Sequence, residues 1–198
     1  CGTFGASSRN WLHLLADNGI GVWQFLPLCP TDPTGSPYSS PSGFALNPWF
    51  LDADDLAKDG FLTESELKEL PGTLKVESSD SLDFSLANSR SSKIGSCLKN
   101  DWVNQSPKIQ SEFLEWSGKQ DWLEDYVSFV ELRRQFDQLP WWQWPQGLAQ
   151  HDEIALNDWK SSWHENLLEH RLLQWHLDRQ WQLIRQTAKE LGVLLFGD

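Results

Sequence analysis

Residues 21–48 of the chain read GVWQFLPLCPTDPTGSPYSSPSGFALNP, and the other predicted elements are arranged around this stretch. Its apolar run from Val22 to Leu28 is too short for a buried helix and is bounded by Gly21 and Pro27. An apolar run of this length between such residues is typical of an interior strand. We therefore predict a buried strand here that leads into a loop.

Proline restricts the conformation of this loop. Six of the ten prolines fall between Pro27 and Pro48. Each ring fixes φ and restricts the residue before it, so the loop loses little conformational entropy when it folds. It can therefore hold Ser36, Tyr38 and Asn47 in fixed positions. A strand that ends in a rigid loop with aromatic and hydroxyl side chains is typical of the ligand sites of α/β barrels.

A helix is predicted before the strand. The apolar residues between Trp11 and Leu15 indicate about three helical turns, with Ser7 or Ser8 as the N-terminal cap. Gly19 is expected to end this helix in the left-handed conformation.

Short helices are also predicted after the loop. Residues 51–60, LDADDLAKDG, indicate a helix that Gly60 ends. Their aspartates lack the glycine and glutamate of a calcium-binding loop, so acidic residues at a helix start are the preferred interpretation. Thr63 and Glu66 have the spacing of a capping box. Residues 71–83 are polar and predict a loop.

The second half of the chain has a helical pattern from Leu86 to about Lys189. Residues 121–136 carry large apolar side chains at a spacing of three to four, as in an amphipathic helix. A last long helix ends at Gly192, and Val193 to Phe196 then predicts a strand. The breaks in the pattern are Pro107, Gly118, Pro140, Pro145 and Gly147.

This order of elements predicts part of a (β/α)8 barrel of the α/β class, running from its first helix to its third strand. A helix that connects two parallel strands is the repeating unit of such a barrel. We expect residues 1–50 and 159–198 to belong to the barrel and residues 51–158 to form a helical inserted subdomain. Two strands cannot close a barrel, so its C-terminal remainder is expected to lie outside the chain.

Charge and composition exclude several classes of partner. The formal net charge is −12, with 16 basic residues against 28 acidic ones, which argues against nucleic acid. No apolar run approaches the ~18–20 residues that span a bilayer, and no signal peptide is visible. Cys1, Cys29 and Cys97 are widely spaced, which favours reduced thiols over a disulfide framework or a zinc site. We expect a soluble cytoplasmic protein that binds neither membrane nor metal nor cofactor.

Thirteen tryptophans are far more than a chain of 198 residues usually carries. An indole ring buries a large apolar face, and it can also stack on a sugar ring. We interpret most of these residues as core. The chain also has no methionine and stops at what reads as a strand just reaching its loop, so we expect both ends to be cut from a longer sequence.

Few catalytic motifs are present. The chain has no GxSxG and no glycine-rich phosphate loop, and its five histidines lie in helical segments without a partner at catalytic or metal-binding spacing. Asp198 stands out among the carboxylates because it follows an apolar strand, where barrel enzymes place active residues. An ordinary capping aspartate is the alternative. The ring of Tyr38 could stack on a sugar or pack under the loop.

The chain resembles the 4-α-glucanotransferases, or amylomaltases, of glycoside hydrolase family 77. The resemblance extends over all 198 residues and depends on motifs in a fixed order, of which the loop motif is the most specific. These motifs are GTFG (2–5), WQFLPL (23–28), PT (30–31), GSPYSSPSGFALNPWFLDADDL (35–56), WLEDYVSF (122–129), WWQWP (141–145), RQW (179–181) and GVLLFGD (192–198).

This resemblance implies a function. Family members transfer α-1,4-glucan segments between maltooligosaccharides, starch-derived glucans and glucose by a retaining double displacement. The reaction needs a carboxylate nucleophile and a carboxylic acid/base about 5 Å apart. In the family these residues follow later strands, one of them in an R-x-D-H motif that this chain lacks. The resemblance therefore implies no catalytic residue within the chain, and we expect no transfer by residues 1–198 alone.

The resemblance also assigns substrate-binding residues. Tyr38 matches the tyrosine that packs on the sugar, Asp198 matches the acid at the end of the third strand, and Ser36 falls in the same loop. The chain departs from the family pattern beside these positions, which puts acceptor preference in doubt. The departures are Cys29 for glycine, Ser39 for glutamine and Leu46 for glycine.

Two other functions remain open from the sequence. A non-catalytic α-glucan-binding module would use the tryptophans as stacking platforms, and the complete protein would then end near Asp198. A helical interaction domain would place the tryptophans in a protein interface, and would form a stable oligomer without affinity for glucans.

Overall fold

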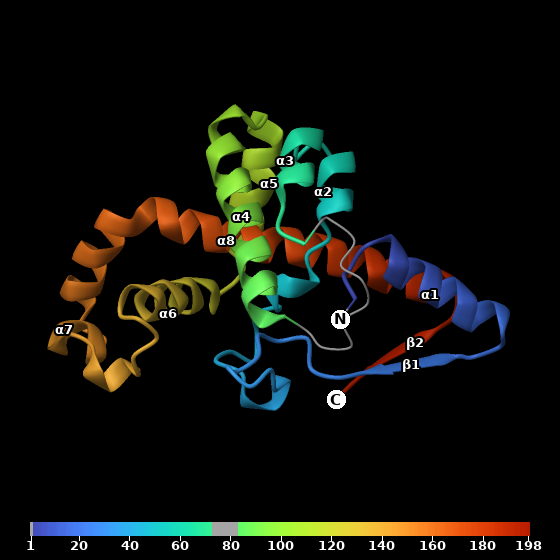
Figure 1. The fold of residues 1–198 in the computed structure, drawn as a ribbon, viewed down its shortest axis with the longest axis horizontal. Coiled ribbons are helices and arrows are strands. Elements are labelled where there is room, and N and C mark those ends of the chain that lie inside the picture. The colour runs from blue at the N-terminus through green and yellow to red at the C-terminus, as the bar shows by residue number, and fades with distance from the viewer. Residues whose placement is uncertain (1, 73–82) are drawn as a thin grey trace.

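One helix, α8 (Glu153–Glu190), runs along most of the molecule, and the other elements pack against it (Figure 1). The computed structural model describes residues 2–72 and 83–198. Asp152 caps α8 by accepting a hydrogen bond from the amide of Ala155, and the helix bends at Trp163, where φ is −119° and ψ is 16°. No helix within the described residues is both long and apolar enough to cross a bilayer.

Two parallel strands form the sheet. β1 (Val22–Phe25) pairs with β2 (Leu194–Gly197), with Val22 opposite Leu194 and Phe25 opposite Gly197. The parallel pairing confirms the prediction. β1 ends three residues earlier than expected, because the chain leaves the extended strand before Pro27.

The prediction that the first strand is interior is wrong for the described residues. One face of the sheet packs on the core through Trp23 and Leu195. Val22, Leu194 and Phe196 on the other face are 51%, 70% and 58% exposed. The apolar pattern predicted the strand correctly, but it did not predict that one face of the strand is left uncovered by the described chain.

Helix α1 (Ala6–Asp17) lies beside the sheet and buries Leu12 and Leu15. The predicted serine cap is wrong, because the helix starts at Gly5 without a side-chain cap. A Cβ atom at Gly5 would lie 2.0 Å from Oδ2 of Asp52, so close packing sets this helix start. The left-handed Gly19, with φ of 71°, is confirmed.

Helices α2 (Ala53–Lys58) and α3 (Glu64–Glu69) follow the loop as predicted. Asp52 caps α2, and Asp55 forms an ion pair with Arg9 of α1 at 2.7 Å. The capping box between Thr63 and Glu66 is confirmed. The acidic cluster therefore connects α1 to α2.

The remaining helices are α4 (Phe84–Asp101), α5 (Pro107–Ser117), α6 (Leu123–Gln135) and the short α7 (Gln146–Ala149). Figure 1 shows α4 and α5 standing on α8, with α6 and α7 beside its N-terminal half. Most of the loop predicted over residues 71–83 lies outside the described residues.

Aromatic residues fill much of the core between these helices. Trp175 of α8 is 3% exposed, and its ring centroid lies 5.6 Å from that of Phe113 and 6.4 Å from that of Trp102. The interpretation of the tryptophans as core is confirmed for most of them, whereas the exposed ones are Trp11, Trp141 and Trp142.

Candidate functional site

The phenol of Tyr38 donates a hydrogen bond to the carboxylate of Asp198, which lies 160 residues further along the chain. Tyr38 belongs to a 3-10 turn, η1 (Pro37–Ser39), and Asp198 directly follows β2. This bond raises the pKa of Tyr38, because the carboxylate accepts the phenolic proton. Tyr38 is 63% exposed, so the pair faces solvent. The structure thus brings together two of the three residues that the sequence selected.

Ser36, the third of these residues, contacts the backbone of Tyr38. Its hydroxyl oxygen accepts a hydrogen bond from the amide of Tyr38 at 3.3 Å and caps the turn. The hydroxyl of Ser36 thus contacts the backbone of Tyr38, whereas the phenol of Tyr38 contacts Asp198.

Asp32 organises the loop and was missed by the sequence reasoning. Its Oδ1 atom accepts hydrogen bonds from the amide of Thr34 at 2.9 Å, the hydroxyl of Thr34 at 2.7 Å and the amide of Ser36 at 2.9 Å. The pKa of Asp32 is lowered, first by the Thr34 hydroxyl and then by the Ser36 amide. An aspartate two residues before a threonine, between prolines, is a turn signal that could have indicated it.

Two further residues of the loop fix its path. Gly35 has φ of 84°, and a Cβ atom there would lie 2.5 Å from Cζ of Phe84. The thiol of Cys29 donates to the carbonyl of Pro37 at 3.2 Å. Cys29 therefore holds the turn that carries Tyr38, at a position where the family resemblance leads one to expect glycine.

Two buried glutamines of α8 hydrogen-bond to the backbone at the C-terminal end of the loop and just after it. Gln174 accepts from the amide of Leu46 at 2.9 Å and donates to its carbonyl at 2.8 Å. Gln180 does the same with the amide and carbonyl of Asp52, each at 2.9 Å. Asn47 between them is 3% exposed and receives an amide hydrogen bond from Trp49.

A hollow of about 850 Å³ is lined by residues of the loop and of α4, α6 and α8. The stacked rings of Trp49 and Phe84, 5.4 Å apart, form part of its wall. Fully buried Glu131 forms another part and binds Arg134 at 2.5 Å and His170 at 3.2 Å. Burial alone would raise the pKa of Glu131, but these hydrogen bonds outweigh it and hold the pKa at about 2. Neither Tyr38 nor Asp198 lines this hollow.

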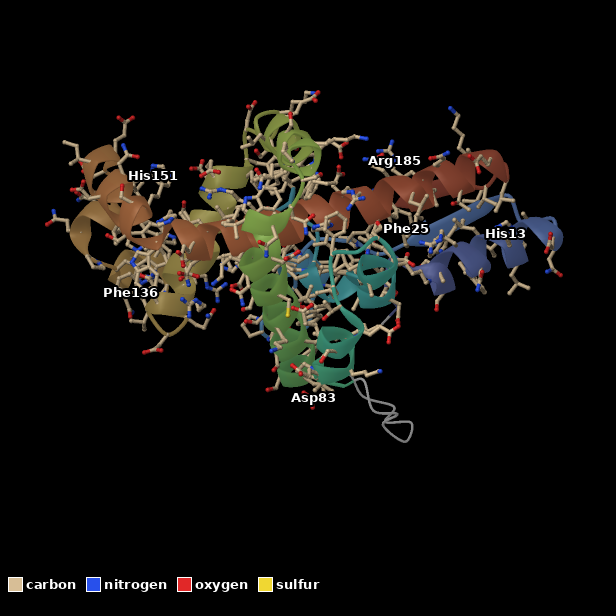
Figure 2. The ribbon with its side chains drawn as sticks, turned by 90° about the horizontal axis from the view of Figure 1, so that it is seen from above. His13, Phe25, Asp83, Phe136, His151 and Arg185 are labelled. Carbon is tan, nitrogen blue, oxygen red and sulfur yellow. The ribbon has the colours of Figure 1, made fainter. Side chains whose placement is uncertain are left out.

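The histidines do not form a site. His13 and His151 lie toward opposite ends of the molecule (Figure 2). His176 is 2% exposed, and its ring packs 4.4 Å from that of Phe61 and 4.7 Å from that of Trp175. No group of three or more histidine, cysteine or acidic side chains suited to a metal ion occurs in the part of the chain that the structure describes.

Comparison with known proteins gives a consistent result. The model of glycoside hydrolase family 77, described as 4-alpha-glucanotransferase, matches residues 1–198. A curated 4-alpha-glucanotransferase of Synechocystis is 33% identical over the whole chain, and one of Thermus thermophilus is 32% identical. The chain covers 39% and 38% of these two relatives, so it spans about two-fifths of their length.

A solved structure has the same fold. The amylomaltase of Streptococcus agalactiae, described in complex with acarbose, aligns with 99% of this chain at a TM-score of 0.90. Its sequence identity is 20%, and the aligned region is 39% of that protein.

Proposed function

Because the chain belongs to the 4-alpha-glucanotransferases of glycoside hydrolase family 77, we propose that it acts in the transfer of α-1,4-glucan segments. The donors are maltooligosaccharides or starch-derived glucans, and the acceptors are glucose or other glucans. The reaction is a retaining double displacement, which needs two carboxyl groups about 5 Å apart. Residues 1–198 contain no R-x-D-H motif, so we assign the nucleophile and the acid/base to sequence outside them.

Within the chain, the contact between Tyr38 and Asp198 carries this proposal. The exposed ring of Tyr38 offers an apolar face to a glucose residue, and Asp198 accepts hydrogen bonds from its hydroxyl groups. Ser36 holds the backbone of Tyr38. The prolines and the hydrogen bonds of Asp32 and Cys29 within the loop keep the ring in one place before the sugar binds, which lowers the entropic cost of binding.

The fold supports part of a (β/α)8 barrel as the scaffold. β1 and β2 are parallel, α8 leads into β2, and the loop after β1 and Asp198 after β2 lie at the same end of the sheet. We assign residues 1–50 and 159–198 to the barrel and residues 51–158 to a helical insertion. Closing the barrel requires strands from outside residues 1–198.

We also propose a cytoplasmic location, on the basis of the free thiols Cys29 and Cys97. Relatives from Arabidopsis thaliana and Oryza sativa are named chloroplastic/amyloplastic.

The two tyrosines allow a direct test of glucan binding at the loop. In a chain labelled with ¹³C on tyrosine rings, only Tyr38 and Tyr126 give signals, and a Tyr38→Phe variant assigns them. We expect maltotetraose to shift the Tyr38 ring signals and to leave those of buried Tyr126 unchanged. Tyr38 signals that do not move, or that move equally with sorbitol, would contradict the proposal.

A further inference from the structure

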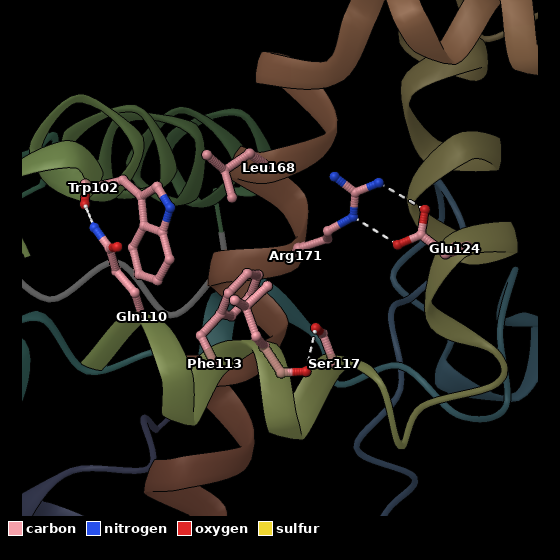
Figure 3. A pocket seen from close by; sticks show the side chains of 8 residues that line it. Trp102, Gln110, Phe113, Ser117, Glu124, Leu168 and Arg171 are labelled. Atoms are coloured by element: carbon pink, nitrogen blue, oxygen red, sulfur yellow. Dashed lines mark hydrogen bonds and ion pairs between the residues drawn. The ribbon is translucent and has the colours of Figure 1, made fainter. Parts of the chain in front are cut away.

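A second, smaller hollow opens between α5, α6 and α8 (Figure 3). Its volume is about 390 Å³, which is within the range of ~300–1,000 Å³ typical of small-molecule sites. None of the residues that line it belongs to the loop that carries Tyr38, and Asp198 is not among them. It is therefore separate from the candidate site described above.

The hollow has an aromatic wall and a charged wall. Trp102, in the 3-10 turn η3 (Trp102–Asn104), stands on one side, and the ion pair of Glu124 and Arg171 stands on the other (Figure 3). Arg171 donates from Nε and Nη2 to the two carboxylate oxygens at 2.7 and 2.6 Å. Leu114 adds apolar surface to the lining and is 66% exposed.

Hydrogen-bonding capacity remains at the rim. Gln110 uses its amide nitrogen on the carbonyl of Trp102 at 3.1 Å, and Ser117 donates its hydroxyl to the carbonyl of Leu114 at 3.2 Å. Within the described chain, Oε1 of Gln110 and Nη1 of Arg171 have no hydrogen-bond partner. A ligand in the hollow thus meets a free acceptor, a free donor and a hydroxyl oxygen that can accept.

Charge and solvation decide which ligand fits. An anion is disfavoured by Glu124 and by the net charge of −12. A cation gains little, because Arg171 already neutralises Glu124. A purely apolar ligand would remove water from the ion pair without replacing its hydrogen bonds, which is costly. A neutral ring with one apolar face and several hydroxyl groups meets all three conditions.

We propose that this hollow is an accessory α-glucan site in which a glucose residue stacks on Trp102 and hydrogen-bonds to Glu124, Arg171 and Gln110. The class of ligand follows from the walls of the hollow, whereas the choice of glucan among sugars rests on the proposed function. An accessory site of this kind raises the effective concentration of a long glucan chain at the protein.

The test uses the 198-residue chain with the Tyr38→Ala substitution, so that the loop contributes no stacking. Indole N–H signals of the ¹⁵N-tryptophan-labelled protein are recorded during titration with maltotetraose, and Trp102→Phe assigns the Trp102 signal. We expect this signal to shift, and we expect sorbitol, which lacks a ring face, to leave it in place.

Two matched variants complete the test. Leu114→Lys replaces an apolar residue of the lining with a long charged side chain, and we expect it to weaken maltotetraose binding at least tenfold. Leu14→Lys replaces a similarly exposed leucine on α1 and is expected to bind as the parent does. Equal affinity in both variants, or an immobile Trp102 signal, overturns the accessory site.

The outcome separates this site from the proposed function. If maltotetraose shifts the Tyr38 ring of the parent chain but not Trp102, the loop site stands and the accessory site is overturned. If Trp102 shifts and Tyr38 does not, the accessory site stands and the assignment of the loop is wrong.

Discussion

At the scale of single residues, the candidate site is a phenol held against a carboxylate by a loop that is itself exposed. Burial cannot fix Tyr38, because its side chain faces solvent. Its hydrogen bonds to Asp198 and Ser36 must therefore fix it, and Asp32 in turn holds the amide of Ser36. This makes the position of the ring sensitive to changes at residues that do not touch a sugar.

The bond between Tyr38 and Asp198 can be measured by titration. Tyr38 and Tyr126 are the only tyrosines, and burial raises the pKa of Tyr126, so absorbance at 295 nm reports Tyr38 first as pH rises. We expect Asp198→Asn to lower the Tyr38 midpoint towards its ordinary value of 10.0, because the variant removes the carboxylate that accepts the phenolic proton and, with it, a negative charge that opposes ionisation. An unchanged midpoint would mean that the pair does not form in solution.

Asp32→Ala is expected to act on Tyr38 from a distance. The substitution removes three hydrogen bonds that shape residues 32–36, so the phenol should leave Asp198 part of the time. The 295 nm midpoint should then fall towards 10.0, while the thermal unfolding midpoint stays equal to that of an Asp121→Ala control at an exposed position. If the Tyr38 titration is the same in both variants, Asp32 does not position the ring.

At the scale of elements, α8 holds the loop through Gln174 and Gln180. Each side chain satisfies one amide and one carbonyl of an irregular segment that has no strand partner in the described chain. The helix thus replaces a neighbouring strand for the loop, which explains why two glutamines are buried at 2% and 7% exposure.

Gln174→Leu should therefore destabilise the fold more than its small change in volume suggests. Leucine leaves the amide and carbonyl of Leu46 without partners, at about 1–3 kcal/mol for each buried group. We expect the free energy of unfolding in urea to fall by roughly 2–4 kcal/mol. Gln182→Leu, at an exposed position of the same helix, is the control and should change it little. Similar losses in the two variants would show that the contact to Leu46 is unimportant.

Local sequence signals predicted most of the elements correctly. The capping box at Thr63, the turn at Gly19 and the two strands depend on neighbours within a few residues, and all are present. The serine cap of α1 was wrong because Asp52, distant in sequence, packs against Gly5 and sets the helix start. Local pattern carries no information about such a contact.

The same distinction applies to the candidate site. Tyr38 and Asp198 could be selected because each follows a strand or lies in a specific motif. Gln174 and Gln180 could not, because a glutamine in a helix is usually exposed and its spacing gives no sign of a partner 128 residues away. Sequence therefore identifies the residues of the candidate site better than the residues that hold them in place.

At the scale of the whole molecule, buried titratable groups couple folding to pH. His176 of α8 is buried against the rings of Phe61 and Trp175, and its Nδ1 atom lies 3.2 Å from Nη1 of Arg179, which pairs with Asp59. Burial first, and the charge of Arg179 second, lower its pKa well below 6.5. The folded state therefore keeps His176 neutral.

Stability should fall as pH drops below 6.5, because the unfolded chain takes up a proton at His176 that the folded chain refuses. We expect His176→Phe, which keeps a ring between Phe61 and Trp175, to lose less unfolding free energy between about pH 7 and pH 5 than the parent. Urea denaturation at a series of pH values measures this. Parallel pH profiles for the two proteins would assign the acid sensitivity to other groups.

The paired glutamines also have an evolutionary consequence. Leu46 and Gln174 are separated by the same number of positions as Asp52 and Gln180, 128 in each case. Inserting one residue into α8 between the glutamines would rotate one of them by about 100° and break its pair. Relatives should therefore gain or lose residues elsewhere. They should conserve the six-residue interval from Leu46 to Asp52 and the equal interval from Gln174 to Gln180.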